Sequence, residues 1–273
     1  MNVKVILTCF NRREKTINCI ESLVKGNPKI DFSFIVVDDN SSDGTIESIN
    51  KLNYDIKLEI GDGNLYWSGG MYKGINAYFN EEQRSNYILL VNDDVKFFDN
   101  VIERLINLSI DNNDSVVVGA TCDNSMEFTY GAMKLISNRK TDLYYHVKPN
   151  NKGIICDTFN ANCVLIKDCI LRDVGNFDKV YRHSLADLDY GFMIRRKGYN
   201  IISSDKFIGI CNRNSIKGTW RDTSLTRLER IKRKESVKGS PIKEWFYFMK
   251  KNFGYIIAIR YSITPYLRIL LNK

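Results

Sequence analysis

Two pairs of adjacent carboxylates stand directly after apolar runs in the sequence. Asp38 and Asp39 follow "FSFIVV", while Asp93 and Asp94 follow "YILLV", with Asn92 between that run and the pair. Adjacent like charges repel one another unless a ligand or a cation lies between them. Carboxylate and amide oxygens are the ligands of hard divalent cations, so the second pair predicts a site for Mg²⁺ or Mn²⁺, which itself often holds a diphosphate. The alternative is that these acids are solvated turn residues.

A glycine-rich segment, "GDGNLYWSGGMYKGIN" (61–76), lies between the two acidic pairs. We expect a helix over 69–80 that begins with Gly69 and Gly70, whose backbone N–H groups then approach a phosphate or a sugar. The alternative is a tight corner without a ligand. The segment is not a P-loop, because GxxxxGK[ST] is absent. It is not the dinucleotide motif either, because the third glycine of GxGxxG is missing.

Two further carboxylates, Asp187 and Asp189, lie near the start of a helix expected over 187–199. Acids at the start of a helix, with Arg195 and Arg196 near its end, complement the helix dipole and need no functional explanation. A carboxylate in this position can also act as a general base if a substrate hydroxyl comes within hydrogen-bond reach. The residue types alone leave both interpretations open.

Short apolar runs alternate with helical patterns through the first hundred residues. Strands are expected at 3–10, 32–37, 56–60 and 87–91, and helices over 13–24, from Thr45 and over 69–80. This alternation predicts an α/β fold with a doubly wound, mostly parallel sheet. Ligands of such sheets bind at the carboxyl ends of the strands. The polar clusters fall at these ends, at 8–13, 38–43, 64–70 and 92–94.

The alternation becomes irregular after residue 100. Strands are expected at 115–122 and 162–166, followed by the helix over 187–199 and a strand or strand pair over 200–211. We expect this half to build the site of a second substrate onto the first. The predicted organisation is a catalytic domain over 1–225, with halves at 1–100 and 101–225, followed by a basic amphipathic helical tail over 226–273.

Composition and charge narrow the class of protein. The 273 residues, 44% of them hydrophobic, are enough for one large domain with a tail. Residues 205–273 hold 16 Lys+Arg against 5 Asp+Glu, so the basic charge is concentrated there. Such a segment suits nucleic acid or an anionic membrane face. The sequence opens without an export signal and its seven cysteines form no CxxC pattern. We therefore expect reduced thiols and a cytoplasmic protein.

The basic tail is aromatic and aliphatic in its second part. Arg260, Pro265 and Arg268 interrupt its apolar residues, which argues against a transmembrane span. An interfacial helix on the inner face of the membrane is expected instead. Its acyl-facing side chains would be Trp245, Phe246, Phe248, Tyr255, Ile256 and Ile259. The alternative is a helical tail that packs on the body or on a second subunit of a homodimer.

The motifs, in their order and spacing, resemble the family-2 glycosyltransferases, which are inverting enzymes of the GT-A fold that use sugar nucleotides. The resemblance covers about residues 3–211. It rests on "ILTCFNR", "IVVDDNSSDGT", "GNLYWSGGMYKGIN", "LLVNDDV", "FNANCVLI" and "ADLDYGFMIRRKGY". The glycine-and-tryptophan segment looks most like enzymes of bacterial surface-polysaccharide assembly, including rhamnosyltransferase-like members.

The resemblance implies roles for individual residues. Asp39 matches the acid that contacts the pyrimidine base, Asp94 the metal-binding acid of the DxD segment, and Asp187 the base that deprotonates the acceptor. The residues expected to bind the nucleotide sugar are Thr8, Asn11, Arg12, Asp39, Asn64, Trp67, Gly69, Gly70, Asn92 and Asp93. Those expected on the acceptor side or in secondary positions are Asn160, Asn162, Asp189 and Arg213.

The chain departs from the family pattern in three places. Asn92 replaces the first acid of DxD, so that a metal would have fewer anionic ligands. Ala186 replaces the Glu that precedes the base. The region after the last expected strand, 209–215, has no His to hold the metal or the diphosphate, although Arg213 can supply positive charge there.

The resemblance implies transfer of a sugar from a UDP- or dTDP-sugar to a hydroxyl of a glycan or lipid-linked acceptor, with Mg²⁺ or Mn²⁺ as cofactor. One alternative is a nucleotidyltransferase acting on a sugar phosphate, although "TCFNRRE" replaces the Gly-rich, Lys-containing loop favoured there. The other alternative is a nucleic-acid-binding module that uses the basic tail. No nucleic-acid-binding motif accompanies the tail, so we expect no nucleic acid partner.

Overall fold

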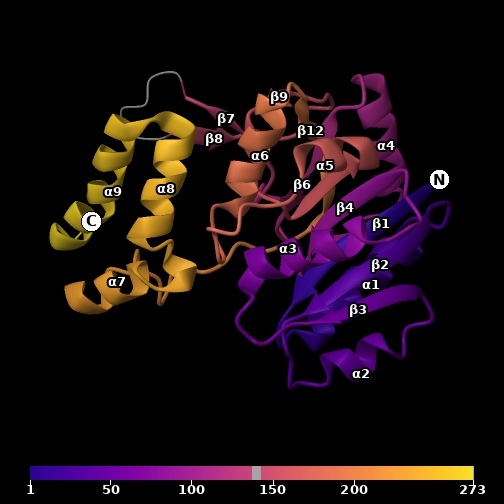
Figure 1. Cartoon of the computed structure of the whole chain (residues 1–273), viewed down its shortest axis with the longest axis horizontal. Helices are drawn as coiled ribbons and strands as arrows, with labels where there is room; N and C mark the ends of the chain where they lie inside the picture. The colour runs from indigo at the N-terminus through magenta and orange to yellow at the C-terminus, as the bar shows by residue number, and fades with distance from the viewer. Residues whose placement is uncertain (137–142, 273) are drawn as a thin grey trace.

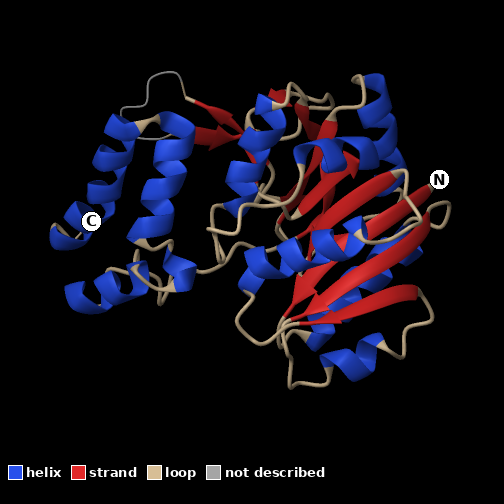
Figure 2. Ribbon diagram, viewed as in Figure 1, coloured by secondary structure: helices blue, strands red, loops and turns tan. Residues whose placement is uncertain are grey.

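The computed structural model describes residues 1–136 and 143–272. The expected acceptor half and tail include residues 137–142 and 273, which lie outside the described residues. A nine-stranded sheet runs through the described part of the chain in the order β3-β2-β1-β4-β11-β6-β12-β5, with β9 pairing with β12 (Figures 1 and 2). Its strands are β1 (Asn2–Cys9), β2 (Asp31–Asp38), β3 (Asp55–Ile60), β4 (Tyr87–Asn92), β5 (Lys96–Phe97), β6 (Val116–Cys122), β9 (Ile155–Cys156), β11 (Cys163–Lys167) and β12 (Ile201–Ile210).

Helices cover both faces of this sheet, which confirms the doubly wound α/β prediction. Alternate residues of a strand point to opposite faces, so Val5 and Leu7 pack in one core with α1 and α4, whereas Ile6 packs in the other with α3, α5 and α6. The helices of the body are α1 (Arg13–Gly26), α2 (Thr45–Ile49), α3 (Tyr66–Phe79), α4 (Val101–Asp111), α5 (Asp168–Val174) and α6 (Ala186–Arg196).

The direction of the strands brings the expected site residues to one edge of the sheet. β3, β2, β1 and β4 are parallel, so their carboxyl ends meet there. β11 is antiparallel to β4, and its first residue, Cys163, pairs with Val91. The loop over 160–162 therefore reaches the same edge from the other direction. β12 runs parallel to β6 and ends there as well, just before Cys211.

The expected start of α3 at the glycine pair is wrong. The helix begins at Tyr66, so Gly69 and Gly70 lie inside it and do not present its first N–H groups to a ligand. Packing explains Gly70, since a Cβ there would come within 2.1 Å of the Thr8 Oγ1. Gly74, one turn later, faces Ile6 in the same way. The two glycines let α3 pack close to β1. The position of α3 in turn fixes the position of the loop that precedes it.

A small antiparallel sheet connects the body to the C-terminal helices. It consists of β10 (Thr158–Phe159), β7 (Ala132–Leu135) and β8 (Tyr144–His146) within the described residues. The C-terminal tail that follows contains α7 (Arg227–Lys234), the 3-10 turn η1 (Val237–Gly239), α8 (Ile242–Phe253) and α9 (Tyr255–Leu270). Figure 1 shows these helices in yellow and orange, beside α6 and far from the N-terminus.

The C-terminal tail is attached to the body by packing and by ion pairs. Phe248 is fully buried and contacts Phe192 of α6, so the expectation that Phe248 faces a lipid is wrong. Trp245 is half-buried and its indole N–H donates to the Tyr261 carbonyl. Lys251 forms ion pairs with Asp178, at 2.9 Å, and with Asp189. The tail is therefore part of the folded body rather than a loose extension.

One face of α9 remains apolar and exposed. Its side chains recur at helical spacing, at Ile256, Ile259, Ile263, Leu267 and Leu270, and Ile256 is 84% exposed. Tyr255 is exposed at the start of the same helix. No helix of the described residues is long and apolar enough to cross a membrane.

Candidate active site

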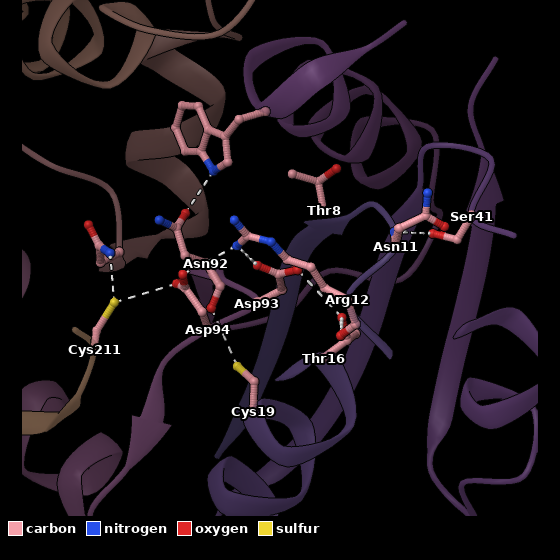
Figure 3. Close-up of polar contacts among 12 residues, drawn as sticks. Thr8, Asn11, Arg12, Thr16, Cys19, Ser41, Asn92, Asp93, Asp94 and Cys211 are labelled. Atoms are coloured by element: carbon pink, nitrogen blue, oxygen red, sulfur yellow. Dashed lines mark hydrogen bonds and ion pairs between the residues drawn. The ribbon is translucent and has the colours of Figure 1, made fainter. Parts of the chain in front are cut away.

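Arg12 bridges the two carboxylates that follow β4. Its Nη1 lies 3.0 Å from the Asp93 Oδ1 and 3.2 Å from the Asp94 Oδ2 (Figure 3). The Asp93 side chain is only 7% exposed, whereas that of Arg12 is 43% exposed. The pKa of Asp93 is raised to about 6. Burial is the main cause, the charge of Arg12 opposes it, and the charge of Asp94 adds to it. The sequence pattern predicted a cation between these acids, and in this structure the guanidinium takes that place.

The donor set at Asp94 is compatible with a divalent cation. Asp94 accepts hydrogen bonds from Arg12 and from the Cys211 thiol, at 3.2 and 3.4 Å, which leaves further lone pairs on its oxygens. Within residues 1–136 and 143–272, no group of three or more His, Cys, Asp and Glu side chains is placed to hold a metal. Mg²⁺ commonly binds through one or two carboxylates together with substrate phosphates, so two acids suffice.

Asn92 connects the end of β4 to the glycine-rich segment and to the second half. Its side-chain oxygen accepts a 2.7 Å hydrogen bond from the Trp67 indole, and its backbone N–H donates to the Asn162 carbonyl. The Asn162 side chain lies 3.4 Å from the Cys211 thiol. Asn92, which stands where an acid was expected, therefore orients an aromatic side chain instead of leaving an anionic oxygen for a metal.

Asp39 holds the start of α3. Its carboxylate accepts hydrogen bonds from the backbone N–H groups of Gly63, Leu65 and Tyr66, at 2.9, 3.2 and 3.0 Å. The N–H groups of Leu65 and Tyr66 are among the donors that a helix start leaves free, and a residue more than twenty positions earlier satisfies them. Asp38 is fully buried and accepts from the Ser41 N–H at 2.6 Å. One acid of the pair thus stabilises its own turn and the other positions α3.

Two of the expected residues lie away from this cluster. Asn11 has a positive φ of 51° and joins two loops, accepting from the Ser42 N–H at 2.8 Å while its own N–H donates to Ser41. Figure 3 shows Asn11 pointing away from Asp93 and Asp94. Asn64 is exposed, and its N–H donates to the Asp62 carboxylate.

A cavity of about 190 Å³ lies over the strand ends, and we call it the strand-end cavity. It brings together five of the expected residues, namely Thr8, Arg12, Asp39, Trp67 and Asp93. It is also lined by six residues that the sequence pattern did not identify as site residues, namely Cys9, Phe10, Gly63, Tyr66, His183 and Lys238. The positive φ of Tyr66, 53°, is unusual for an aromatic residue, but only the structure shows it. Lys238 comes from the C-terminal tail, so the tail closes this cavity.

Asp187 and Asp189 point to different parts of the molecule. Two residues along a helix turn by about 200°, so the two side chains leave α6 on nearly opposite sides. Asp187 lies beside the loop over 160–162, with its Oδ2 at 3.5 Å from the Asn160 amide and 3.4 Å from the Ala161 N–H. Burial raises the pKa of Asp187 above its usual value, while the hydrogen bond from the Leu188 N–H, the largest opposing effect, lowers it.

Asp189 is 1% exposed, and its closest partners lie in α8. It pairs with the Lys251 Nζ at 2.7 Å and accepts from the Asn252 amide at 2.8 Å. Its role in this structure is to hold the C-terminal tail. Arg213 donates to the Phe128 carbonyl at 3.0 Å and lines a cavity of about 380 Å³ together with Asp94.

The fold and the site define a glycosyltransferase of the GT-A type. The chain belongs to glycosyl transferase family 2, whose family model matches residues 4–169. No curated protein matches the chain.

Two solved structures share the fold at low sequence identity. One is the mannosyltransferase PcManGT from Pyrobaculum calidifontis in complex with GDP-Man and Mn²⁺, with a TM-score of 0.57 and 12% identity, covering 98% of this chain and 74% of that chain. The other is TarS 1–349 from S. aureus, with a TM-score of 0.56 and 14% identity, covering 98% of this chain and 81% of that chain. The chain is therefore a glycosyltransferase that uses nucleotide sugars.

The protonation of His183 provides a test of the strand-end cavity. Burial first, and then the charges of Lys238 and Arg12, lower the pKa of His183 from 6.5 to about 4. Its Nδ1 has no hydrogen-bond partner in the described residues. Between these two pKa values the unfolded chain binds more protons than the folded one, so stability falls as the pH falls from about 6.5 to about 4.

We expect His183→Gln to remove this pH dependence, because glutamine does not titrate. The wild type should lose up to about 3 kcal/mol relative to the variant between pH 7 and pH 4. Urea unfolding of both proteins across this range measures the difference. The other histidine, His146, is present in both proteins and cancels. Parallel stability profiles for the two proteins would contradict a buried, neutral His183.

Proposed function

We propose that this chain is an inverting glycosyltransferase that moves a sugar from a UDP- or dTDP-sugar to a hydroxyl of a glycan or lipid-linked acceptor in bacterial surface-polysaccharide synthesis. The observation that carries the proposal is the meeting of Arg12, Asp93 and Asp94 with the loop that holds Asp187 at one edge of the sheet. In this proposal Arg12 and the acids beside it serve the diphosphate and its cation, and the Asp187 carboxylate serves as the base.

The nucleotide sugar occupies the strand-end cavity in this proposal. Arg12 is exposed enough to contact a diphosphate and is charged at every physiological pH. Asp94 would hold Mg²⁺ or Mn²⁺ alongside the donor phosphates. When bound, that cation stabilises the negative charge that develops on the leaving diphosphate. Asp39, whose carboxylate already orders the Tyr66 backbone, lies at the base-binding end, and the rings of Phe10 and Tyr66 offer stacking surfaces.

Asp187 is the base in this proposal. Its carboxylate has amide donors on one side, at Asn160 and Ala161, and these fix its orientation without neutralising it. Attack by an acceptor hydroxyl on the face of the sugar opposite the diphosphate inverts the anomeric carbon in one step, and Asp187 takes the hydroxyl proton. The raised pKa of Asp187 makes it a stronger base than an ordinary aspartate.

We expect Asp187→Asn to reduce sugar transfer by at least ~10²-fold, because general-base catalysis typically contributes 10²–10⁴-fold. Calorimetry should show that the variant binds the nucleoside diphosphate as tightly as the wild type. The acidic limb of the wild-type kcat/KM profile should lie above the pH expected for an ordinary aspartate, and it should be missing in the variant. A fully active Asp187→Asn enzyme would exclude this base.

Asp189→Asn is the matched control on the same helix. It removes a carboxylate of equal size that lies two residues away and holds Lys251. The control should lower thermal stability by about 1–3 kcal/mol, since it weakens a buried ion pair, while transfer at low temperature stays close to that of the wild type. Loss of transfer in both folded variants would mean that the two acids cannot be separated by role.

The metal site is tested by Asp94→Asn. Residues that hydrogen-bond to a metal ligand typically contribute about 10–100-fold to the affinity for the metal. Loss of the ligand itself should therefore raise the Mn²⁺ concentration for half-saturation at least ~10-fold. Isothermal titration of Mn²⁺ in the presence of a nucleoside diphosphate measures the effect without relying on turnover. Asp111→Asn, an exposed acid at the end of α4, serves as the control. Equal Mn²⁺ affinity in all three proteins would rule out Asp94 as the ligand.

A panel of UDP-, dTDP- and GDP-sugars, incubated with the protein and Mn²⁺, tests the reaction class. Release of a nucleoside diphosphate supports sugar transfer. Release of inorganic pyrophosphate from a nucleoside triphosphate and a sugar phosphate would support the nucleotidyltransferase alternative instead.

We propose a peripheral contact of α9 with an anionic membrane surface on its inner, cytoplasmic side. The exposed apolar face of α9 is accompanied by exposed cations, among them Arg260 and Arg268 on the same helix and Lys243 and Lys250 on α8. Such a combination favours interfacial binding. The alternative occupant of this face of α9 is a second copy of the chain, which would make the protein a homodimer.

Substitution of two α9 residues distinguishes these occupants. Full-length Ile256→Glu/Ile263→Glu should lose flotation with anionic liposomes, because two charges replace apolar contacts with the acyl boundary. Ile110→Glu, at an exposed position of α4, should float as the wild type does. Flotation of the double variant at the wild-type level would contradict membrane contact. A concentration-dependent dimer that the double variant abolishes would assign the face to a second copy.

A further inference from the structure

A second cavity, of about 280 Å³, lies within the C-terminal tail, and we call it the tail cavity. Its walls come from the C-terminal tail, namely the end of α7, η1, α8 and α9. Trp220 and Arg221, together with Leu143 and Tyr144 at the start of β8, complete the lining. Four aromatic side chains contribute to its wall, namely Tyr144, Trp220, Trp245 and Tyr261. Aromatic faces of this kind can pack against the apolar face of a sugar ring.

Three cations line the tail cavity, and none of its lining residues is acidic in the described part of the chain. They are Arg221, Lys234 and Arg268. The Arg221 guanidinium lies 5.1 Å from the centroid of the Trp220 ring, and the Lys234 Nζ lies 5.8 Å from that of Trp245. Within residues 1–136 and 143–272, none of the three forms an ion pair with a carboxylate. Lys234 is only 2% exposed, and burial lowers the pKa of its ammonium. A hydrogen bond to the Ser240 carbonyl and the charges of Glu235 and Glu244 oppose this cost, and an anion in the cavity would oppose it further.

A groove of about 660 Å³ leads from the tail cavity to the strand-end cavity. It shares Trp220, Arg221 and Gly239 with the first and Tyr66 and Lys238 with the second. Arg233 adds a further cation, and this groove too has no acidic lining residue in the described chain. The tail cavity and the groove therefore form one path lined by cations and by no acid of the described residues, and this path reaches the strand-end cavity at Tyr66 and Lys238.

One residue of the wall of the tail cavity, Tyr144, is affected by the charge of Asp187. The pKa of Tyr144, whose side chain lines the tail cavity, is raised to about 12 by burial and next by the negative charge of Asp187, while the charge of Arg221 opposes this. The phenol therefore lies within electrostatic reach of both residues.

We propose that the tail cavity and its groove bind the acceptor, and that the acceptor carries a phosphate or diphosphate group held by Arg221, Lys234 and Arg268. The inference rests on the proposed sugar transfer and assigns a substrate class to the acceptor side. Three cations around one small cavity match a phosphate of nearly two negative charges, or a diphosphate, better than the single charge of a carboxylate. Guanidinium groups bind phosphate oxygens in a bidentate way, which two of the three can provide.

Binding to the full-length protein tests the phosphate requirement, with saturating UDP present to fill the strand-end cavity. The intrinsic fluorescence of Trp220 and Trp245 reports on the tail cavity. The probes are glucose, glucuronic acid, glucose 1-phosphate and a short glycerol phosphate oligomer. We expect both phosphate probes to bind at least ~10-fold more tightly than the other two, and more weakly at high salt. The tighter phosphate probe indicates whether a sugar phosphate head group or a phosphodiester chain is the source. Equal binding of glucose and glucose 1-phosphate would overturn the inference.

Substitutions locate the phosphate. Arg221→Gln and Arg268→Gln should each weaken binding of glucose 1-phosphate about tenfold, and Arg268→Lys should recover part of the loss. Arg260→Gln, which removes a charge from the same helix outside the cavity, is the control and should bind as the wild type does. Both arginines of the cavity can be replaced without disturbing a buried ion pair, and thermal unfolding confirms that the variants are folded. Unchanged binding in the folded Arg221→Gln and Arg268→Gln variants would overturn the assignment.

The inference and the proposed function fail in different ways. Release of a nucleoside diphosphate from a sugar nucleotide with water as acceptor depends on the strand-end cavity and does not require a bound acceptor. If the wild type releases none from any sugar nucleotide, the proposed function fails, whatever the phosphate probes show. If release is normal but phosphate probes gain nothing over glucose, only the acceptor inference fails.

Discussion

The buried charge of Asp93 is the constraint on which the site depends. A carboxylate that is 7% exposed and adjacent to a second acid needs a cation close by, and Arg12 provides it from the loop after β1. This requirement joins β1 to β4 at their carboxyl ends. Because those strands are parallel, the polar residues of both are held at one edge of the sheet without any further device. A cation that arrives with a substrate must share these oxygens with Arg12.

The second half of the chain reaches this edge through strand direction. β11 is antiparallel, so its amino end meets the carboxyl end of β4, and Asn162 receives the N–H of Asn92. The loop over 160–162 in turn holds Asp187 at the start of α6. The end of β4 and Asp187 are therefore linked through two hydrogen bonds, from the Asn92 N–H to the Asn162 carbonyl and from the Ala161 N–H to the Asp187 carboxylate. The separation of Asp187 and Asp189 follows from the helical turn between them, which directs one acid to the loop over 160–162 and the other to the tail.

Local patterns in the sequence predicted the body of the fold well. Buried parallel strands are continuous apolar runs, and their ends were marked by the polar residues that now surround the cavity. The local pattern could not predict the start of α3, because the carboxylate that caps it belongs to Asp39, which directly follows β2. The packing of Phe248 and the pairing of Asp189 with Lys251 were missed for the same reason: each joins residues more than fifty positions apart. Lys238 and His183 reach the cavity only through that tertiary packing.

The 3-10 turn η1 belongs to two binding surfaces at once. Lys238 faces the strand-end cavity, while the next residue, Gly239, lines the tail cavity. A Cβ at Gly239 would come within 2.0 Å of the Arg233 carbonyl, so this backbone has no room to adapt. On the proposed assignment, substitutions in these few residues would affect the donor site and the acceptor site together, and exchange of the tail between related chains would alter both.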